Sequence, residues 1–444
     1  MSHIPPRNRF WLPVAFLMMI VLPPQAFALR IEPGLGVGAE YSDNAGLTED
    51  GEDEDLIATA LVAAKLVHDT GPLQFDIGGS YTYRHYTHDT FGDKNYFNLD
   101  ADLEWEIARD RLRWSVQDFF EQRPVDSIEP DTPNNIQNSN LFTTGPVLTL
   151  RPGERHALVI SPTFRDVRFE DSDTDSRQYD LSANWSYRMS PGLAVGLDGS
   201  IRQVEFDDDN NPDFRANSLL AVLTGGFATS TSTYTLRLGV NEFERDRFED
   251  ESGLAGNADW SIDLTGRSTA RLFIGSELTD AGASALRSAV DPGTGDADNE
   301  QISGDVFRNG VLRAEYDLNG SILAVSSWIE VRDLDYKASP QDREIQDVGL
   351  VLDYRMTPRL VPGLYGGYNR TELTDADRTD KERIFGGRLA FNLSRSLRTQ
   401  FTLQYREKNS TRRADEFEEF SAFLSLSYGF GNIEARGQRA AFSF

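Results

Sequence analysis

One tract of the chain, Arg177–Arg188, alternates between apolar and polar side chains. Side chains of an extended strand point to opposite faces in turn, so this tract has one apolar face and one polar face. The apolar face carries Tyr179, Leu181, Ala183, Trp185 and Tyr187. Strands of soluble sandwiches are usually about 5–6 residues long, whereas this alternation is about twice that length and recurs along most of the chain. It predicts an all-β, membrane-spanning antiparallel barrel.

The connections between the alternating tracts are of two kinds that follow each other in turn. Nine are short and use Gly, Pro, Asp, Asn and Ser, and ten are longer and acidic. Turn residues of this kind close tight hairpins. Short turns at one end and longer loops at the other are the arrangement of an outer-membrane barrel, in which the strand number is even. We predict an up-and-down barrel of about 20 strands, with 18 as the alternative.

The first 28 residues differ from the rest. Arg7 and Arg9 precede the apolar run of residues 10–22, and residues 26–28 form a small-x-small cleavage site. This is the pattern of a secretory signal peptide. We therefore predict a signal peptide over 1–28 with cleavage near Ala28, a barrel over 29–430 and a C-terminal tail or closing segment over 431–444. The predicted location is the outer membrane of a Gram-negative bacterium, and no disulfide is available because the chain has no cysteine.

The charge balance excludes one class of partner. The formal net charge is −27, whereas neutralising nucleic-acid phosphates requires a basic surface. Intrinsic disorder is also excluded, because the chain is 11% aromatic and regularly patterned.

Nothing in the sequence predicts an enzyme. Only His68, His85, His88 and His156 lie beyond residue 28, and no nucleophile elbow, zinc-protease motif or phosphate loop is present. We predict no catalytic residue, no metal site and no cofactor. The acidic runs at 49–55 and 170–175 are rich in oxygen ligands but lack the spacing of a calcium-binding loop. They are interpreted as solvated loops, with divalent bridging to lipopolysaccharide phosphates as the weaker alternative.

The polar phase of the strands predicts the wall of a water-filled lumen, and the apolar phase predicts a lipid-facing surface free of charge. The residues predicted to line the pore are Asp100, Asp102, Glu104, Asp180, Asn184, Arg188, Arg355, Arg398 and Arg406. Trp105, Trp114, Trp185 and Tyr187 lie near short turns, where an interfacial aromatic girdle is expected. Residues 281–303 form the longest loop, interpreted either as a constriction folded into the lumen or as a surface loop.

The first strand after residue 28 ends in Tyr41, Asp43, Asn44 and Leu47, in the arrangement Tyr-x-Asp-Asn-x-x-Leu. This resembles the start of a family of outer-membrane β-barrel porins associated with exopolysaccharide production loci (beta-barrel porin 2-like). Elsewhere the chain resembles the family only in its succession of strands and turns. The resemblance implies a passive conduit through which a polymer is pushed by its synthesis and export machinery. Asp43 and Asn44 would then cap the first strand.

Two functions follow as hypotheses. The first is export of an exopolysaccharide, and the alternative is a general or solute-selective diffusion porin. A structural or adhesive barrel is a third possibility, supported only by the acidic loops. The predicted partners are outer-membrane lipids and lipopolysaccharide, a polysaccharide or small hydrophilic solutes, and a periplasmic polysaccharide export protein.

Overall fold

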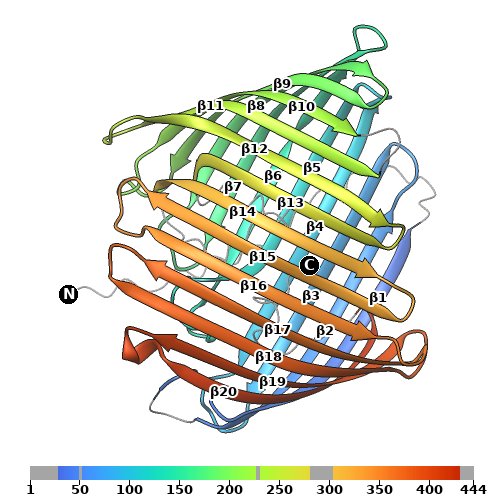
Figure 1. The fold of residues 1–444 in the computed structure, drawn as a ribbon, viewed down its shortest axis with the longest axis vertical. Helices are drawn as coiled ribbons and strands as arrows, with labels where there is room; N and C mark the ends of the chain where they lie inside the picture. Colours follow the sequence, from blue (N-terminus) through green and yellow to red (C-terminus); the bar gives the residue numbers. More distant parts are fainter. Residues whose placement is uncertain (1–28, 50–52, 227–230, 281–303, 431–444) are drawn as a thin grey trace.

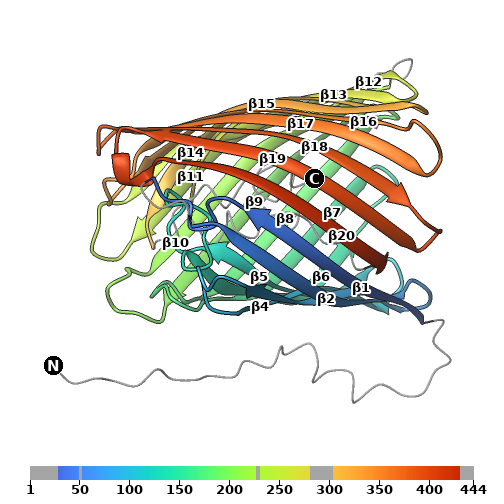
Figure 2. The same ribbon diagram turned by 90° about the horizontal axis from the view of Figure 1, so that it is seen from below.

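The computed structural model describes residues 29–49, 53–226, 231–280 and 304–430, and these residues form one closed wall of antiparallel strands (Figure 1). Each strand pairs with its neighbours in sequence, and β1 pairs with β20, which closes the barrel (Figure 2). The first ten strands are β1 (Arg30–Ser42), β2 (Asp55–His68), β3 (Leu73–Tyr86), β4 (Lys94–Ala108), β5 (Leu112–Pro124), β6 (Ile136–Leu150), β7 (His156–Phe169), β8 (Ser176–Ser190), β9 (Leu193–Phe206) and β10 (Phe214–Gly226). The second ten are β11 (Ser232–Arg245), β12 (Glu251–Thr265), β13 (Ser268–Asp280), β14 (Val306–Asn319), β15 (Leu323–Tyr336), β16 (Arg343–Tyr354), β17 (Leu360–Leu373), β18 (Arg378–Asn392), β19 (Leu397–Ser410) and β20 (Phe417–Gly429).

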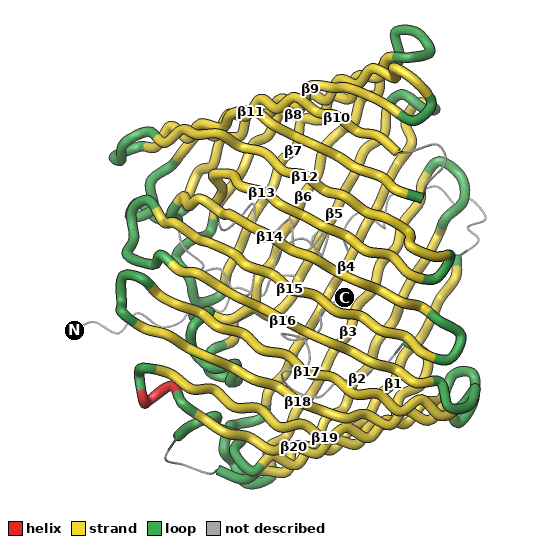
Figure 3. Tube along the Cα trace, in the orientation of Figure 1, coloured by secondary structure: helices red, strands yellow, loops and turns green. Residues whose placement is uncertain are grey.

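The barrel has 20 strands, which confirms the predicted fold class and removes the 18-strand alternative. Nearly all of the described trace is strand, with connections at the two ends of the barrel (Figure 3). Short connections lie at one end of the barrel, which we call the turn end. Longer connections lie at the other end, which we call the loop end, and the two kinds alternate along the chain. A short 3-10 helix, η3 (Arg413–Asp415), lies in the last loop. The predicted signal peptide and the tail over 431–444 lie outside the described residues.

Away from the loop end, the outer surface of the wall is largely apolar, as the alternation predicts. On β8, Tyr179 and Leu181 are 47% and 48% exposed, and Leu238 on β11 and Leu254 on β12 reach 67% and 71%. Large apolar side chains this exposed all around a closed barrel would not be stable in water. They fit a lipid environment, in which a charge on the outer face at midplane would cost about 2–4 kcal/mol. The fold therefore defines a membrane-spanning β-barrel.

No helix among the described residues combines the length and the apolar character needed to cross a membrane.

Aromatic side chains gather near the turn end of this outer surface. Trp105 and Trp114 are paired across β4 and β5 and are 51% and 38% exposed. Trp185 and Tyr187 are partly covered by His156, whose ring lies 5.9 Å and 4.8 Å from theirs. These positions are those of an interfacial aromatic girdle, whose rings sit at the lipid headgroups.

Charged side chains break the apolar phase, so the expectation of an outer face free of charge is wrong. Some lie near the loop end, such as Asp166 and Arg168 of β7 and Glu344 of β16, whereas Asp118 lies midway along β5. Asp118 lies in β5 between Val116 and Phe120 on the outer face, opposite Ala101 of β4 and Phe142 of β6. It is only 1% exposed, and its Oδ1 atom accepts a hydrogen bond of 2.7 Å from Asn140 Nδ2. Neighbouring side chains and this amide shield the carboxyl group from lipid, which reduces the cost of placing it there.

Acidic residues end the strands at the loop end. In five of the loops, the residue just before the returning strand accepts a hydrogen bond from the last backbone N–H of the preceding strand. Asp175, Asp213 and Asp342 do this for Phe169, Phe206 and Tyr336 at 2.8, 2.9 and 2.7 Å. Asp250 and Glu416 do the same for Arg245 and Ser410 at 3.3 and 3.4 Å. An unpaired buried backbone N–H is costly, so part of the loops' acidity is structural.

Candidate functional site

The loop between β5 and β6, residues 125–135, extends to the opposite inner wall of the barrel. The Ile128 carbonyl oxygen accepts hydrogen bonds from Lys408 Nζ of β19 at 2.8 Å and from an Arg378 guanidinium nitrogen of β18 at 3.4 Å. The Ser127 hydroxyl oxygen accepts one from Arg343 of β16 at 2.9 Å. Because β16, β18 and β19 lie far from β5 and β6 around the closed strand order, the loop must cross the lumen to make these contacts.

The crossing loop is ordered by its own hydrogen bonds. The Asn135 side chain donates to the Asp126 carbonyl oxygen at 2.8 Å and accepts from the Asp126 backbone N–H at 2.9 Å. Asp126 in turn accepts from the Ile128 N–H at 2.9 Å. On the near wall, Lys94 Nζ of β4 donates to the Pro133 carbonyl oxygen at 3.3 Å. Fixing the loop locally reduces the conformational entropy lost when it binds the far wall.

The three anchoring cations are themselves held in place. Arg343, Arg378 and Lys408 are 2%, 8% and 7% exposed. Asp380 binds Arg378 at 2.6 Å and Lys408 at 3.1 Å, and Asp415 binds Arg378 at 3.0 Å. A buried charge is costly unless it is paired, so this network sets the position at which the loop is held.

A second inward feature lies at the loop end of β13 and β14. The pairing of β12 with β13 begins at Gly256 and Ser276, so β13 leaves β12 beyond Ser276 while remaining paired with β14 to Asp280 and Val306. Leu278 and Val306 pack against Val204, Phe214 and Phe243, which come from β9, β10 and β11. The Leu278 carbonyl oxygen accepts a hydrogen bond from Asn241 Nδ2 at 2.8 Å, and Asp280 forms an ion pair with Arg202 of β9. The strand ends therefore fold against the inner wall.

The predicted constriction over 281–303 lies outside the described residues. The constriction that the structure describes is formed by 125–135, which the sequence did not distinguish from the other acidic loops. Its cationic anchors, Arg343, Arg378 and Lys408, were also not predicted as a group.

Eight of the nine residues predicted to line the pore lie on strands, in the phase opposite to the exposed apolar side chains. Asp100, Asp102 and Glu104 are on β4, Asp180, Asn184 and Arg188 are on β8, and Arg398 and Arg406 are on β19. Arg355 differs, because β16 ends at Tyr354. Its guanidinium donates to the Gly320 carbonyl oxygen at 2.7 Å and to Asn319 Oδ1 at 3.1 Å. The structure thus places Arg355 in the turn at the rim.

Charges on most of the inner wall are paired. Arg165 and Asp180 lie 2.8 Å apart between β7 and β8, and Arg388 and Asp353 lie 2.7 Å apart between β18 and β16. Arg406 of β19 is paired with Glu382 of β18. These groups satisfy one another between adjacent strands or, for Arg388 and Asp353, across β17, so their charges largely cancel at the wall.

The inner face of β4 is different, because carboxylates follow one another there at every second residue. Asp100, Asp102, Glu104 and Glu106 occupy this face. Glu104 has a 3.3 Å ion pair with Arg113, and Asp102 accepts a 3.2 Å hydrogen bond from the neutral amide of Gln117. Among the described residues, no ion pair is formed by Asp100, Asp102 or Glu106. We call these four carboxylates the acidic strip of β4.

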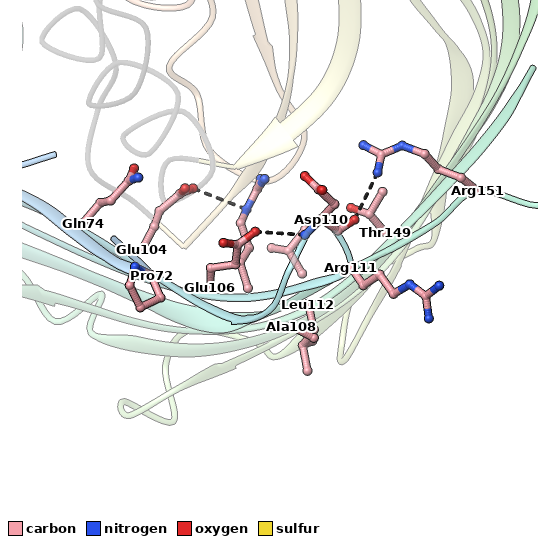
Figure 4. A pocket seen from close by; sticks show the side chains of 12 residues that line it. Pro72, Gln74, Glu104, Glu106, Ala108, Asp110, Arg111, Leu112, Thr149 and Arg151 are labelled. Carbon is pink, nitrogen blue, oxygen red and sulfur yellow. Dashed lines mark hydrogen bonds and ion pairs between the residues drawn. The ribbon is translucent and has the colours of Figure 1, made fainter. Parts of the chain in front are cut away.

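The strip ends in a cavity of about 250 Å³ at the turn end of β3–β6 (Figure 4). Gln74, Glu104 and Glu106 lie on one side of this turn-end cavity, and Arg151 and Thr149 lie on the other. Glu106 Oε1 accepts a 2.9 Å hydrogen bond from the Asp110 N–H, and Arg151 donates one of 3.1 Å to the Asp110 carbonyl oxygen. Groups of both signs therefore line one cavity.

Tyr41, Asp43, Asn44 and Leu47, the residues of the family resemblance, lie where β1 meets β20 at the loop end. The Asp43 carboxylate accepts a 2.7 Å hydrogen bond from the Phe420 N–H. Asn44 Nδ2 donates to the Glu418 carbonyl oxygen at 2.9 Å and to the Thr48 carbonyl oxygen at 2.8 Å. Tyr41 donates to Glu54 at 3.2 Å, and Leu47 has a positive φ of 53°. The geometry of the motif is that of a strand cap at the barrel seam.

One carboxyl group of the loop end has a shifted pKa and lies outside the strands. Asp93 binds His85 Nδ1 at 2.7 Å and accepts a 2.7 Å hydrogen bond from the Tyr83 hydroxyl. The bond to His85, followed by that to Tyr83, lowers the pKa of the Asp93 carboxyl. No group of three or more His, Asp or Glu side chains with metal-binding geometry occurs among the described residues.

No protein-family model matches the chain, and no curated protein matches it. Among solved structures, the chain is similar to OccK2 (OpdF) of Pseudomonas aeruginosa in complex with glucuronate, with 10% identity, a TM-score of 0.42 and coverage of 91% of this chain and 100% of that one. It is also similar to the FrpB iron transporter of Neisseria meningitidis, with 8% identity, a TM-score of 0.48 and coverage of 90% and 82%. The chain is also similar to the siderophore receptor PirA of Pseudomonas aeruginosa, with 12% identity, a TM-score of 0.46 and coverage of 90% of this chain and 80% of that one. We draw no functional conclusion from likenesses this distant.

Proposed function

We propose that the protein is an outer-membrane channel for passive diffusion of small hydrophilic solutes. The observation that carries this proposal is the loop over 125–135, which is held across the lumen by Arg343, Arg378 and Lys408. A barrel of this size without an inward loop would leave a wide aqueous channel. The crossing loop narrows it, and the charged wall favours polar solutes over apolar ones.

The exopolysaccharide conduit implied by the Tyr41–Leu47 resemblance is the competing function. A polymer chain would have to pass the 125–135 loop, whose three anchors are buried and two of which, Arg378 and Lys408, are paired with Asp380. The residues of the resemblance form a cap at the β1–β20 seam, and their hydrogen bonds join loop and strand backbone. The geometry therefore supports a channel for small solutes better than a polymer conduit.

Single-channel conductance in planar bilayers tests the proposal. We expect the purified barrel to give a steady conductance in KCl, and deletion of residues 127–133 with a Gly-Gly junction to increase it at least about twofold, because the lumen loses its crossing segment. A matched control is Arg359→Gln, which removes an exposed cation from the turn between β16 and β17, at the end of the barrel opposite the 125–135 loop. An unmodified barrel that does not conduct would contradict the proposal.

Swelling of proteoliposomes in isotonic sugar solutions measures the largest solute that the barrel admits. The proposal predicts entry of monosaccharides and amino acids and slow entry of longer oligosaccharides. Two results together would favour the polymer conduit instead. Deletion of the gene would stop secretion of the polymer, and the purified barrel would not conduct in bilayers.

A further inference from the structure

The turn-end cavity contains opposite charges that do not neutralise each other. Six ionised side chains line the cavity: Glu104, Glu106, Asp110, Arg111, Arg113 and Arg151. Glu104 and Arg113 form an ion pair at 3.3 Å, and Glu106 and Arg151 lie on the two sides of the cavity. The carboxylate of Glu106 accepts only a neutral backbone N–H, and the guanidinium of Arg151 donates to a neutral backbone carbonyl group. Among the described residues, neither Glu106 nor Arg151 has an ion-pair partner.

Glu106 and Arg151 are held at fixed places by the same turn. Their hydrogen bonds go to the N–H and the carbonyl oxygen of one residue, Asp110, which has a positive φ of 57° in the β4–β5 turn. Anchoring both side chains on the backbone of one residue fixes the separation of the two charges. A site with one fixed anion and one fixed cation suits a ligand that carries a cation and an anion of its own.

The remaining lining supplies neutral hydrogen-bonding groups. Gln74 and Thr149 lie on the two sides of the cavity, and Val147 and Leu112 add a small apolar surface. Pockets for drug-sized ligands are usually about 300–1,000 Å³. A cavity of about 250 Å³ therefore matches a smaller solute of amino-acid size.

We propose that the turn-end cavity binds small zwitterionic solutes of the amino-acid type, with the ammonium group at Glu106 and the carboxylate at Arg151. The proposal rests on the proposed function, because it names the class of solute that leaves the lumen at this end. The acidic strip of β4 leads to the cavity along the same wall, so the ammonium group meets carboxylates before it reaches Glu106.

Titration calorimetry on the full barrel in detergent tests the site with three probes. Glutamine carries both charges, glutamine amide carries only the ammonium group, and N-acetylglutamine carries only the carboxylate. Glutamine should bind about tenfold more tightly than either singly charged analogue, because each lost ion pair removes one charge-assisted contact.

Two variants assign the contacts. Glu106→Gln should weaken binding of glutamine and of glutamine amide about tenfold and leave N-acetylglutamine unchanged, whereas Arg151→Gln should show the reverse selectivity for the two analogues. Arg109→Gln is the matched control, since Arg109 lies in the same turn, is almost fully exposed and does not line the cavity.

Three results would each overturn the zwitterion site. They are equal affinity for all three probes, no measurable binding of glutamine, and an equal loss of glutamine affinity in Glu106→Gln and Arg109→Gln. The proposed function has a separate readout. A barrel that conducts but does not bind glutamine contradicts only the site, and a barrel that binds glutamine but does not conduct contradicts only the channel.

Discussion

The inner faces of β4 and β19 carry similar numbers of polar side chains but arrange them differently. On β19, Arg406 and Lys408 are 6% and 7% exposed and are bound to Glu382 and Asp380 of β18. On β4, Asp100, Glu104 and Glu106 are exposed to the lumen, and within the described part of the chain Glu104 alone of the acidic strip has an ion-pair partner. The charges on β19 hold the crossing loop, whereas those on β4 remain available to solutes. Two walls of one lumen thus separate the anchoring of the loop from the recognition of solutes that we propose.

The largest expected effect comes from removing the carboxylate that pairs with two of the cations anchoring the crossing loop. Asp380→Asn removes the ionised partner of both Arg378 and Lys408 and weakens the bond from Ser410. Leaving buried cations without their partner should lower the free energy of unfolding by about 3–5 kcal/mol. Urea unfolding of the barrel in lipid vesicles, followed by tryptophan fluorescence, measures the change.

Asp102→Asn is the matched substitution on β4, and it should lower the unfolding free energy by less than about 1 kcal/mol, because this carboxylate has only a neutral amide partner. Equal effects of the two substitutions would remove the distinction between the two walls.

Ion selectivity tests the other side of the comparison. The double substitution Asp100→Asn and Asp102→Asn should lower the ratio of cation to anion permeability about twofold, because two uncompensated negative charges leave the wall. Reversal potentials across a KCl gradient give this ratio. Glu344→Gln, on the outer phase of β16 near the loop end, removes a charge away from the lumen and should leave the ratio unchanged.

The smallest expected effect concerns an exposed carboxyl group at the loop end, away from both walls. Because the Asp93 pKa is lowered in the folded protein, its contribution to stability is present above the unfolded pKa of about 3.9 and is lost as the pH falls through the folded value. The difference in Tm between the unmodified protein and Asp93→Asn should therefore be largest near pH 5, where Asp93 is ionised and its partner His85 is protonated, and it should disappear as the pH falls through the folded pKa of Asp93. A difference that does not shrink as the pH falls below about 4 would contradict this assignment.

The strands and their order could be predicted from the sequence because each strand has its own alternation of apolar and polar residues and is bounded by its own turn residues. In Arg177–Arg188 the alternation fixes which residues face lipid, and the turns on either side fix where the strand ends. Arg355 shows the limit of this reasoning. Its phase matches the polar face of β16, but the strand ends one residue earlier, at Tyr354, and the periodicity does not mark that boundary.

The crossing loop could not be predicted in the same way. Ser127 and Ile128 meet residues 216, 250 and 280 positions away in the chain. The loop is acidic like its neighbours, and its Pro and Asn also occur together in residues 207–213, so its composition does not single it out. Asp118 is intermediate, because a lone acid between Val116 and Phe120 is visible in the sequence. Its partner Asn140 depends on the register between β5 and β6, which the sequence leaves open.

The acids that end the strands have a consequence for how the loops can vary. Asp175, Asp213 and Asp342 each occupy the position immediately before the returning strand, whatever the loop contains before it. Only that final position is tied to the wall by this bond. This bond therefore places no constraint on the segments ahead of it. Changes of length or sequence that spare the other contacts of these segments, such as those of Asp171 and Ser172 with Gln137, leave the barrel edge in place, and surface variation should accumulate there.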